Sequence, residues 1–291
     1  MATRNQPVIE REPLPTAPSG RFRTRSLMDT AGERLRGLPL GVRLRGWGRA
    51  AYHAAWFVQT GGRGLSCTLP SGELIRVLPE HRYLSWNPIE YAAFRAAVTP
   101  GTVALDIGAN VGAYTLLLAH WVGKAGRVYA FEPSRPAFRG LRRHISLNLQ
   151  GDVVRPLPVA VSDREGSANL IAASTAGESR LAGGFETASG VTVAVTTIDN
   201  FCAQEGVQPS FIKVDVEGEE LGVLRGARET IRKAGDRLAL FVELHPSIWP
   251  VNGTARSEID AELDRQGLRI QPLSGTDPWS VEGMVVRMVR R

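Results

Sequence analysis

Apolar runs of strand length alternate with helix-length segments from residue 101 onward, and this alternation limits the fold more than any other feature of the sequence. Strands are predicted at 103–107, 127–131, 153–161, 211–216 and 238–244. Helices fit between and after them at 111–121, 134–148, 219–234 and 257–265. Such alternation is typical of a parallel sheet covered by helices on both faces. We therefore predict an α/β fold with a doubly wound, mostly parallel Rossmann-like sheet.

Two segments interrupt or close this alternation. Residues 167–201 contain two predicted short strands around a loop of small residues at 175–190, and the C-terminal segment is predicted to form an antiparallel hairpin at the sheet edge. Upstream, a helix is predicted within 42–59, a β-hairpin at 65–78 with its turn at 70–72, and a helix capped by Asn87 with Pro88 in its first turn. These predictions divide the chain into three parts: a flexible basic arm at 1–40, a helix and hairpin cap at 41–100, and a Rossmann-like domain at 101–291.

The positive charge of the chain is confined to its N-terminal segment. The net charge is +6 over 291 residues, and residues 1–50 hold ten arginines against four acids, so the remainder is formally neutral. A basic face for nucleic acid is therefore not expected on the folded domain, although the arm could contact a membrane surface peripherally. No apolar run approaches the ~20 residues that span a bilayer, and no signal-peptide core is visible, so a cytoplasmic location is expected. Cys67 and Cys202 are far apart in sequence and are expected to be buried thiols.

The segment LDIGANVG follows the first strand of the predicted domain and suggests a ligand site. In doubly wound folds, ligands bind beyond the carboxyl ends of the strands. Gly108 and Gly112 allow a sharp bend and close contact with the backbone, and the following helix presents free N–H groups. Asn110 stands where a dinucleotide motif has its middle glycine, and no phosphate-binding Gly-Lys-Ser/Thr is present. Asp106 before the bend suits a cationic ligand, such as an amino group or a sulfonium.

Acids at the next two strand ends extend this site. Glu132 lies 24 residues beyond Gly108, where a carboxylate can accept hydrogen bonds from ribose hydroxyls. Asp163, with Ser162 beside it, is placed to accept the exocyclic amine of adenine. Each acid alone could be a helix cap or a solvated loop residue. Together with Asp106 they indicate S-adenosylmethionine as the cofactor.

A second informative segment, FIKVDVEGEELGVLRGA, carries charges where a central strand should be apolar. In one interpretation, Lys213 pairs with Asp215 and Glu217 caps the next helix. In the other, Asp215 and Glu217 lie beside the reacting centre, with Lys213 next to them. His245 ends the fifth strand and is either a hydrogen-bonded structural residue or a base with an ordinary pKa near 6.5.

The sequence does not require a metal ion, and no metal site is expected. No His/Cys cluster has zinc-binding spacing. A magnesium-assisted alternative would use oxygen ligands from Asp199, Asp215 and Glu243.

With these residues identified, the chain resembles the FkbM family of S-adenosylmethionine-dependent methyltransferases over roughly residues 90–245. The similarity rests on LDIGANVGAYT, VYAFEPSRPAFRGLRRHISLN, AVSDREG, TTIDNF and FIKVDVEGEELGVLRGA. The resemblance implies a methyltransferase (EC 2.1.1.-), in most members acting on hydroxyls of sugars, glycolipids or polyketide-type molecules. It also implies cofactor contacts from Asp106, Gly108, Asn110, Gly112, Glu132 and Asp163.

Three other functions remain open from the sequence. The acceptor could be a macromolecule such as RNA or protein, reached through the basic arm. The chain could bind the cofactor without catalysis. An NAD-dependent enzyme is disfavoured by the missing glycine.

Overall fold

The computed structural model describes residues 22–23, 55, 58, 60–172, 179–181 and 190–291 of the chain. The predicted arm at 1–40, the predicted helix at 42–59 and the predicted loop at 175–190 therefore lie, apart from a few residues, outside the described part. Within that part, no helix is both long enough and apolar enough to span a membrane.

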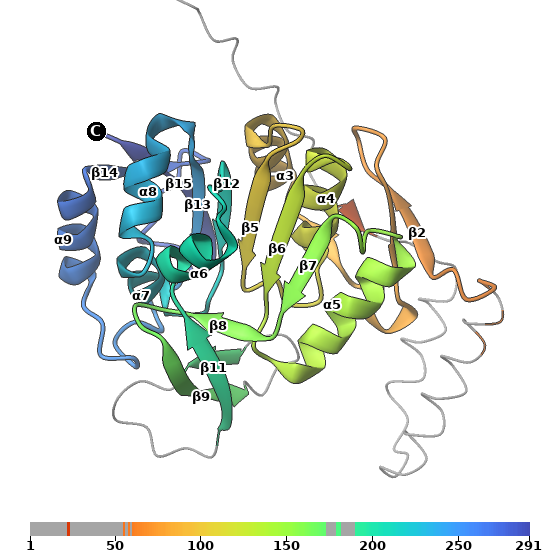
Figure 1. Ribbon diagram of the computed structural model, residues 1–291, viewed down its shortest axis with the longest axis horizontal. Coiled ribbons are helices and arrows are strands. Elements are labelled where there is room, and N and C mark those ends of the chain that lie inside the picture. Colours follow the sequence, from red (N-terminus) through yellow and green to blue (C-terminus); the bar gives the residue numbers. More distant parts are fainter. Residues whose placement is uncertain (1–21, 24–54, 56–57, 59, 173–178, 182–189) are drawn as a thin grey trace, which may run out of the picture.

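A seven-stranded sheet forms the centre of the molecule, in the order β14-β15-β13-β12-β5-β6-β7 (Figure 1). Five of its strands are parallel, namely β5 (Val103–Ile107), β6 (Arg127–Phe131), β7 (Val154–Leu157), β12 (Phe211–Val214) and β13 (Ala239–Leu244). The chain runs from β5 outward to β7, then returns to place β12 on the other side of β5. This reversal creates a switch point between β5 and β12, where ligands bind in open α/β sheets.

The antiparallel edge is also as predicted. Strands β14 (Leu268–Pro272) and β15 (Met284–Arg290) form the closing hairpin, and β15 pairs antiparallel with β13. The prediction of a doubly wound, mostly parallel sheet is therefore confirmed.

Helices cover both faces of this sheet because successive strand residues point to opposite sides. Ala104 packs in the core shared with α3 (Pro88–Ala97), α4 (Ala113–Val122) and α5 (Arg135–Leu147). Leu105 packs in the core on the opposite face, which is covered by α6 (Ile198–Glu205), α7 (Glu220–Arg225), α8 (Arg228–Ala234) and α9 (Arg256–Gln266). As predicted, the Asn87 side chain caps α3 by accepting a hydrogen bond from the Ile89 N–H.

A second, smaller sheet lies across one end of the central sheet (Figure 1). Its order is β10-β9-β11-β8, with β8 at Val159–Val161, β9 at Gly166–Ala172, β10 at Ser179–Leu181 and β11 at Val191–Thr196. The single strand predicted at 153–161 is wrong, since it divides into β7 and β8 around Pro158. Proline cannot donate a ladder hydrogen bond, and the chain changes sheets at this point, with β7 pairing to β6 and β8 pairing to β11.

The prediction of one continuous helix at 219–234 is also wrong, since the structure has two helices there. The segment divides into α7 and α8 around Gly226, which packs so closely on the Ser162 backbone that a Cβ there would lie 2.1 Å from the Ser162 carbonyl oxygen. Asp199 stabilises the new helix start by accepting hydrogen bonds from the N–H groups of Glu229 and Thr230, at 3.0 and 2.7 Å. Asp199 is thus a helix-capping residue, which removes it from the metal-ligand set considered above.

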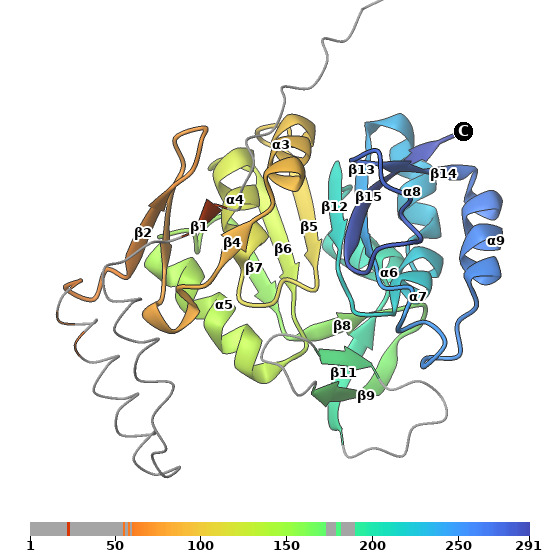
Figure 2. The same cartoon turned by 180° about the vertical axis from the view of Figure 1, so that it is seen from behind.

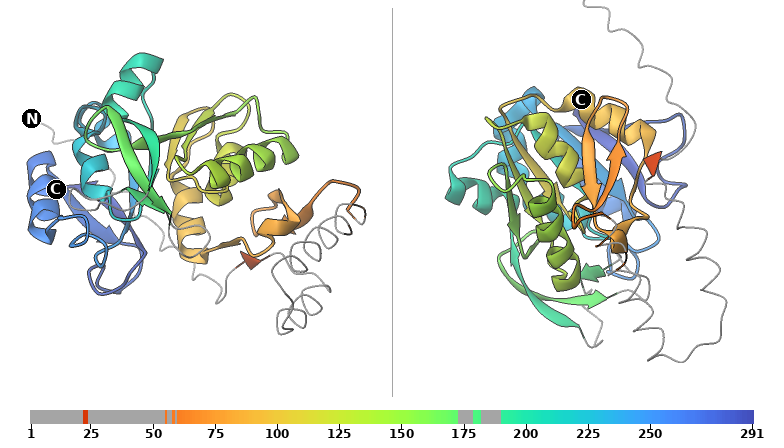
Figure 3. Two further views of the ribbon diagram at one scale, coloured as in Figure 1. Left: turned by 90° about the horizontal axis from the view of Figure 1, so that it is seen from below. Right: turned by 90° about the vertical axis from the view of Figure 1, so that its right-hand side faces the viewer.

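The predicted hairpin is present as β2 (Leu65–Thr68) and β3 (Leu74–Val77), and it packs beside α5 (Figure 2). Buried Glu73 ties it to the domain by accepting hydrogen bonds from the Tyr91 hydroxyl and the Trp121 indole N–H. A short pair, β1 (Phe22–Arg23) with β4 (Ser85–Trp86), completes the strands. The hairpin and the small sheet lie apart from each other (Figure 3). Cys67 and Cys202 are both buried free thiols, as expected.

Candidate functional site

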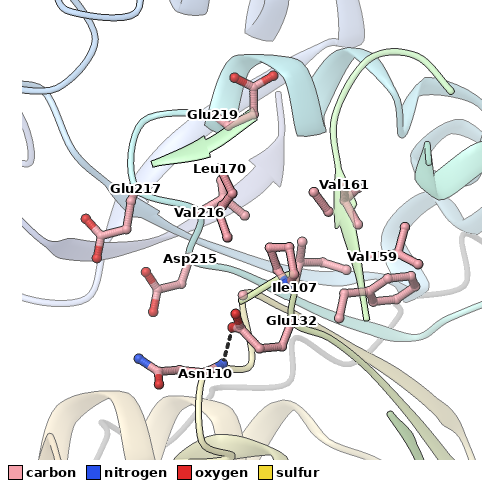
Figure 4. Close-up of a pocket in the computed structure, with 14 residues that line it drawn as sticks. Ile107, Asn110, Glu132, Val159, Val161, Leu170, Asp215, Val216, Glu217 and Glu219 are labelled. Atoms are coloured by element: carbon pink, nitrogen blue, oxygen red, sulfur yellow. Dashed lines mark hydrogen bonds between the residues drawn. The ribbon is translucent and has the colours of Figure 1, made fainter. Parts of the chain in front are cut away.

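A cleft of about 590 Å³, part of it open to solvent, lies at the switch point of the central sheet and beneath the small sheet. Its size is within the range of small-molecule sites. One side is apolar and comes mainly from the small sheet; we call Val159, Val161 and Leu170 the apolar side. The other side follows β12; we call Asp215 and Glu217 the acidic side (Figure 4).

The bend after β5 forms the floor between these two sides. Gly108 has a φ of +80°, and a Cβ there would lie 1.7 Å from the Asp215 carbonyl oxygen. Only glycine therefore allows the two strand ends to approach this closely. Asn110 also has a left-handed backbone, with a φ of +51°, so α4 begins at Ala113 and not at the predicted residue 111. Gly112, with a φ of +97°, is the N-cap residue of α4 and does not line the cleft.

Glu132 lines the cleft from the end of β6. Its Oε2 accepts a hydrogen bond from the Asn110 N–H at 2.8 Å (Figure 4), and its Oε1 accepts one from the Ser134 N–H at 2.7 Å. Burial raises the pKa of Glu132 from 4.5 to about 7, and the nearby acids Asp215 and Asp106 add to the effect. The carboxyl group is thus held in place by two backbone donors and lies close to its point of ionisation at neutral pH.

Asp106 lies elsewhere than the sequence suggests. We predicted that it faces a cationic ligand, but it is 1% exposed and lies outside the set of residues lining the cleft. Its Oδ2 accepts a hydrogen bond from the Thr115 hydroxyl at 2.5 Å, while Oδ1 is buried without a hydrogen-bond partner among the described residues. Burial raises the pKa of Asp106, opposed by the neighbouring Lys213. Asp106 therefore contacts α4 directly and interacts electrostatically with Lys213.

Lys213 and Asp215 form the predicted pair, with the ammonium nitrogen 2.9 Å from Asp215 Oδ2. Lys213 is 3% exposed and lies 5.5 Å from the centre of the Tyr114 ring. Burial alone would lower the pKa of Lys213, but Asp215, Asp106 and Glu243 outweigh it and raise that pKa. Burial would raise the pKa of Asp215, but Lys213 and His245 outweigh it and lower that pKa. The two groups remain oppositely charged, with Asp215 on the acidic side of the cleft and Lys213 buried behind it.

His245 completes this end of the site from the end of β13. Its Nδ1–H donates a hydrogen bond to Glu220 Oε1 at 2.7 Å, and its Nε2 lies 3.5 Å from Glu217 Oε2 and 3.9 Å from Glu243 Oε1. Burial would lower the pKa of His245, but Glu220, Glu217 and Asp215 outweigh it and raise the pKa to about 9. The sequence left two interpretations open, a hydrogen-bonded structural histidine or a base with an ordinary pKa near 6.5. The surrounding carboxylates instead keep the imidazole protonated near neutral pH in the ligand-free protein.

The sequence profile of the methyltransferase FkbM domain matches residues 106–270, which is more than half of the chain. The chain belongs to the FkbM methyltransferase family. The hexuronic acid methyltransferase AglP of Haloferax volcanii is 27% identical over 153 residues, which cover 52% of this chain and 59% of that protein. The chain thus spans less than two thirds of the length of this curated relative.

Solved structures of methyltransferases are similar to this member of the FkbM family at low identity. An S-adenosylmethionine-dependent O-methyltransferase from Thermotoga maritima is 12% identical, with a TM-score of 0.41 over 78% of this chain and 77% of the other. Fibrillarin from Aeropyrum pernix, with bound S-adenosylmethionine, is 15% identical, with a TM-score of 0.41 over 77% and 93% of the two chains.

The FkbM family uses S-adenosylmethionine, and the cleft fits this cofactor. The bend at Gly108 forms a cradle that a Cβ would fill. Glu132 presents a carboxyl group that can accept further hydrogen bonds, since each carboxylate oxygen has two lone pairs. The apolar side offers a surface for a flat aromatic base. A cationic sulfur would also be stabilised by the nearby acids.

Two predicted adenine contacts lie outside the set of residues that line the cleft of this FkbM protein. Ser162 is 3% exposed and donates its hydroxyl to Glu219 Oε1 at 2.5 Å. Asp163 pairs with exposed Arg164 at 3.0 Å. Glu219 itself does line the cleft, and burial raises its pKa. Ser162 thus contacts Glu219, and Glu219 lines the cleft next to the start of α7 (Figure 4).

Glu220 is a buried acid of the candidate site that the sequence analysis did not single out. It is fully buried, with Oε1 accepting hydrogen bonds from Gly218 N–H and His245, and Oε2 accepting one from the Trp249 indole at 2.6 Å. A signal was present in the sequence, because Glu220 precedes the apolar residues of a helix that faces the core. An acid on such a face needs buried partners.

Proposed function

We propose that this protein transfers a methyl group from S-adenosylmethionine to a hydroxyl group of a small molecule, with a sugar as the favoured acceptor class. The observation that carries this proposal is the meeting, in one cleft, of a cofactor-sized hollow with an acidic side formed by Asp215 and Glu217. A hydroxyl acceptor must lose a proton as it is methylated, and these side chains can receive one. The similarity to a hexuronic acid methyltransferase supports a sugar acceptor.

The residues of the cleft divide the work of binding. In this proposal, Glu132 accepts hydrogen bonds from the ribose hydroxyls, and the apolar side packs against adenine. Gly108 and Asn110 place the backbone against the methionine portion. Ser162 holds Glu219 at the adenine end, with Asp163 beside it. Asp106 and Gly112 support the bend through α4.

The remaining residues act on the acceptor. The bound cofactor supplies a methyl group on a positively charged sulfur, and its transfer to an acceptor oxygen leaves a neutral thioether and releases the hydroxyl proton. Glu217 receives that proton, because its carboxylate lines the cleft and its side chain is 24% exposed. Asp215 aligns the acceptor hydroxyl and is itself held by Lys213. His245 holds Glu217 in place from the side. Alignment of this kind can supply effective molarities of about 10⁵–10⁸ M.

A macromolecular acceptor is the second candidate, and the basic segment at 1–50 is the feature that favours it. Binding to phosphates strengthens with each cationic contact, but the rest of the chain has equal numbers of basic and acidic residues. A small acceptor, met in the cytoplasm or at a membrane surface touched by the basic segment, therefore fits this chain better.

A product screen tests the proposal directly. The full chain is incubated with methyl-labelled cofactor and, in parallel, with free hexuronic acids, neutral hexoses, a glycolipid fraction and total RNA. We expect a labelled methyl ether on a sugar hydroxyl, located by mass spectrometry. Label in RNA or in protein would replace the proposal by the macromolecular alternative. Cofactor binding without any labelled product would indicate a non-catalytic module.

A further inference from the structure

Three potential metal ligands meet at the end of the acidic side. Asp215 and Glu217 follow β12 and His245 follows β13, and one ligand atom from each lies within 4.8 Å of the other two. Figure 4 shows the carboxyl groups of Asp215 and Glu217 on the same side of the cleft. They differ from the set considered from sequence, because Asp199 caps α8.

The histidine of this group is already oriented as a metal ligand. Its side chain is 6% exposed, and its Nδ1–H donates to the buried carboxylate of Glu220. Metal-binding histidines almost always donate their second ring N–H to a carboxylate or carbonyl in this way. Nε2, the atom left for a metal, makes no hydrogen bond to any residue that the structure describes, and its nearest carboxylate oxygens lie 3.5 and 3.9 Å away. A ring nitrogen of a buried histidine thus lies between two carboxylates, at 3.5 Å or more from the oxygens of each.

Carboxylates gather around this group. Asp215 pairs with Lys213, and Glu217, Glu220 and Glu243 lie near the His245 ring. A divalent cation would place positive charge between these carboxylates.

The geometry points to a divalent-cation site formed by Asp215, Glu217 and His245, of the kind that Mn²⁺ fills. Two carboxylate oxygens and one imidazole nitrogen are a mixed donor set that suits Mn²⁺. Three protein ligands leave coordination positions free, which hydroxyl oxygens of an acceptor can occupy. Vicinal hydroxyls of a sugar would then be held against the cofactor. The role of the cation in holding acceptor hydroxyls rests on the proposed function, whereas its binding to the three ligands does not.

Electron paramagnetic resonance of Mn²⁺ tests the site without any assay of activity. Free Mn²⁺ gives a strong six-line signal that weakens on binding, so titration of the full chain counts the bound ions. We expect one bound Mn²⁺ per chain. Spin-echo spectra of the bound ion should show coupling to one histidine nitrogen. Absence of binding at millimolar Mn²⁺, or a bound ion without nitrogen coupling, would overturn the proposal.

Variants assign the ligands. Glu217→Gln should weaken Mn²⁺ binding at least tenfold, and Glu220→Gln should weaken it about 10–100-fold by releasing His245. Glu229→Gln, which removes a carboxylate from an exposed pair on α8, is the matched control and should bind as the original chain does. Equal binding by all three variants would place the ion elsewhere and overturn the ligand set. The lead variant is Glu217→Gln because its side chain is partly exposed, and thermal unfolding of each variant verifies that it is folded.

Calorimetry with S-adenosylhomocysteine on the same samples separates this proposal from the proposed function. In the original chain, absence of Mn²⁺ binding together with intact S-adenosylhomocysteine binding and methyl transfer would overturn the cation site alone. Mn²⁺ binding in a chain that binds no adenosyl compound would support the cation site and overturn the methyltransferase proposal.

Discussion

The apolar side and the acidic side of the cleft face each other but are built in different ways. Val159, Val161 and Leu170 belong to the small sheet, where neighbouring strands pair and pack. Asp215 and Glu217 follow a central strand and are placed by ion pairs with Lys213 and His245. Strand pairing within the small sheet forms the apolar side, whereas the acidic side exists only where strand ends of the central sheet meet.

This difference indicates a division of labour. The apolar side offers surface to a flat base and has no group that could move a proton. The acidic side has several such groups and little apolar surface. Substitutions on the two sides should therefore change different quantities. Those on the acidic side should lower turnover, and those on the apolar side should weaken cofactor binding.

The largest expected effect is on the acidic side. Asp215→Asn should lower turnover about 10²–10⁴-fold, the range for loss of a positioned acid or base, and leave cofactor affinity within about twofold. Initial rates with labelled cofactor and calorimetry with S-adenosylhomocysteine measure the two quantities. Asp260→Asn, on an exposed pair with Arg256, is the control. If Asp215→Asn fails to fold, the Lys213–Asp215 pair is primarily structural, since an unpaired buried lysine costs about 3–5 kcal/mol.

The next effect lies where the two sides approach each other. Gly108→Ala should lower the free energy of unfolding by about 3 kcal/mol or more, from left-handed strain of about 1–2 kcal/mol plus displacement of the Asp215 backbone. Urea denaturation measures it. Gly101→Ala is closely matched, with a φ of +79° but its nearest Cβ contact at 3.9 Å, and should show the strain alone. Equal losses in the two variants would show that the close approach to Asp215 is unimportant.

A smaller effect is expected at the floor of the cleft. Glu132→Ala should weaken S-adenosylhomocysteine binding by about 1.5–3 kcal/mol, the range for hydrogen bonds to a charged group. Calorimetry gives the value, with Glu258→Ala, whose side chain is 43% exposed and lies on α9, as the control. Unchanged affinity would remove the ribose assignment.

The pH dependence of binding provides an independent test of Glu132. Burial raises its folded-state pKa to about 7, so the uncharged form is favoured below that pH and its stabilising contribution is lost as the pH rises through 7. Cofactor binding should show the opposite trend, because the ionised form accepts hydroxyl protons better. Affinity should rise from pH 6 to 8 by up to about tenfold per unit below 7. Glu132→Gln should flatten this profile, and a profile that stays the same in the variant would assign the titration to another group.

The smallest effect is on the apolar side. Val159→Ala should weaken S-adenosylhomocysteine binding by about 1 kcal/mol, from the loss of two buried methyl groups, and leave turnover at saturating cofactor within about twofold. Exposed Val251→Ala is the control for the same change elsewhere. A large loss of turnover in Val159→Ala would break the division between the two sides.

The sequence by itself determined the features that depend on local pattern. Strand and helix periodicity predicted the doubly wound sheet, and the glycines around Asn110 predicted the bend at the switch point. The acid that follows β6 predicted Glu132 in the cleft, where the structure places it. These features follow from backbone preferences and from the edge at which parallel strands end, both of which can be deduced along one stretch of chain.

Only the tertiary structure decided which side chains of the site are buried and which of them are charged. It moved β8 into a second sheet, withdrew Asp106 behind α4, and joined Glu220 to His245, a residue 25 positions away in the sequence. It also raised the pKa of His245 to about 9, where the sequence suggested an ordinary histidine. Solvation and Coulomb energies depend on distances between groups that are remote in sequence, and those distances exist only after the strands have assembled.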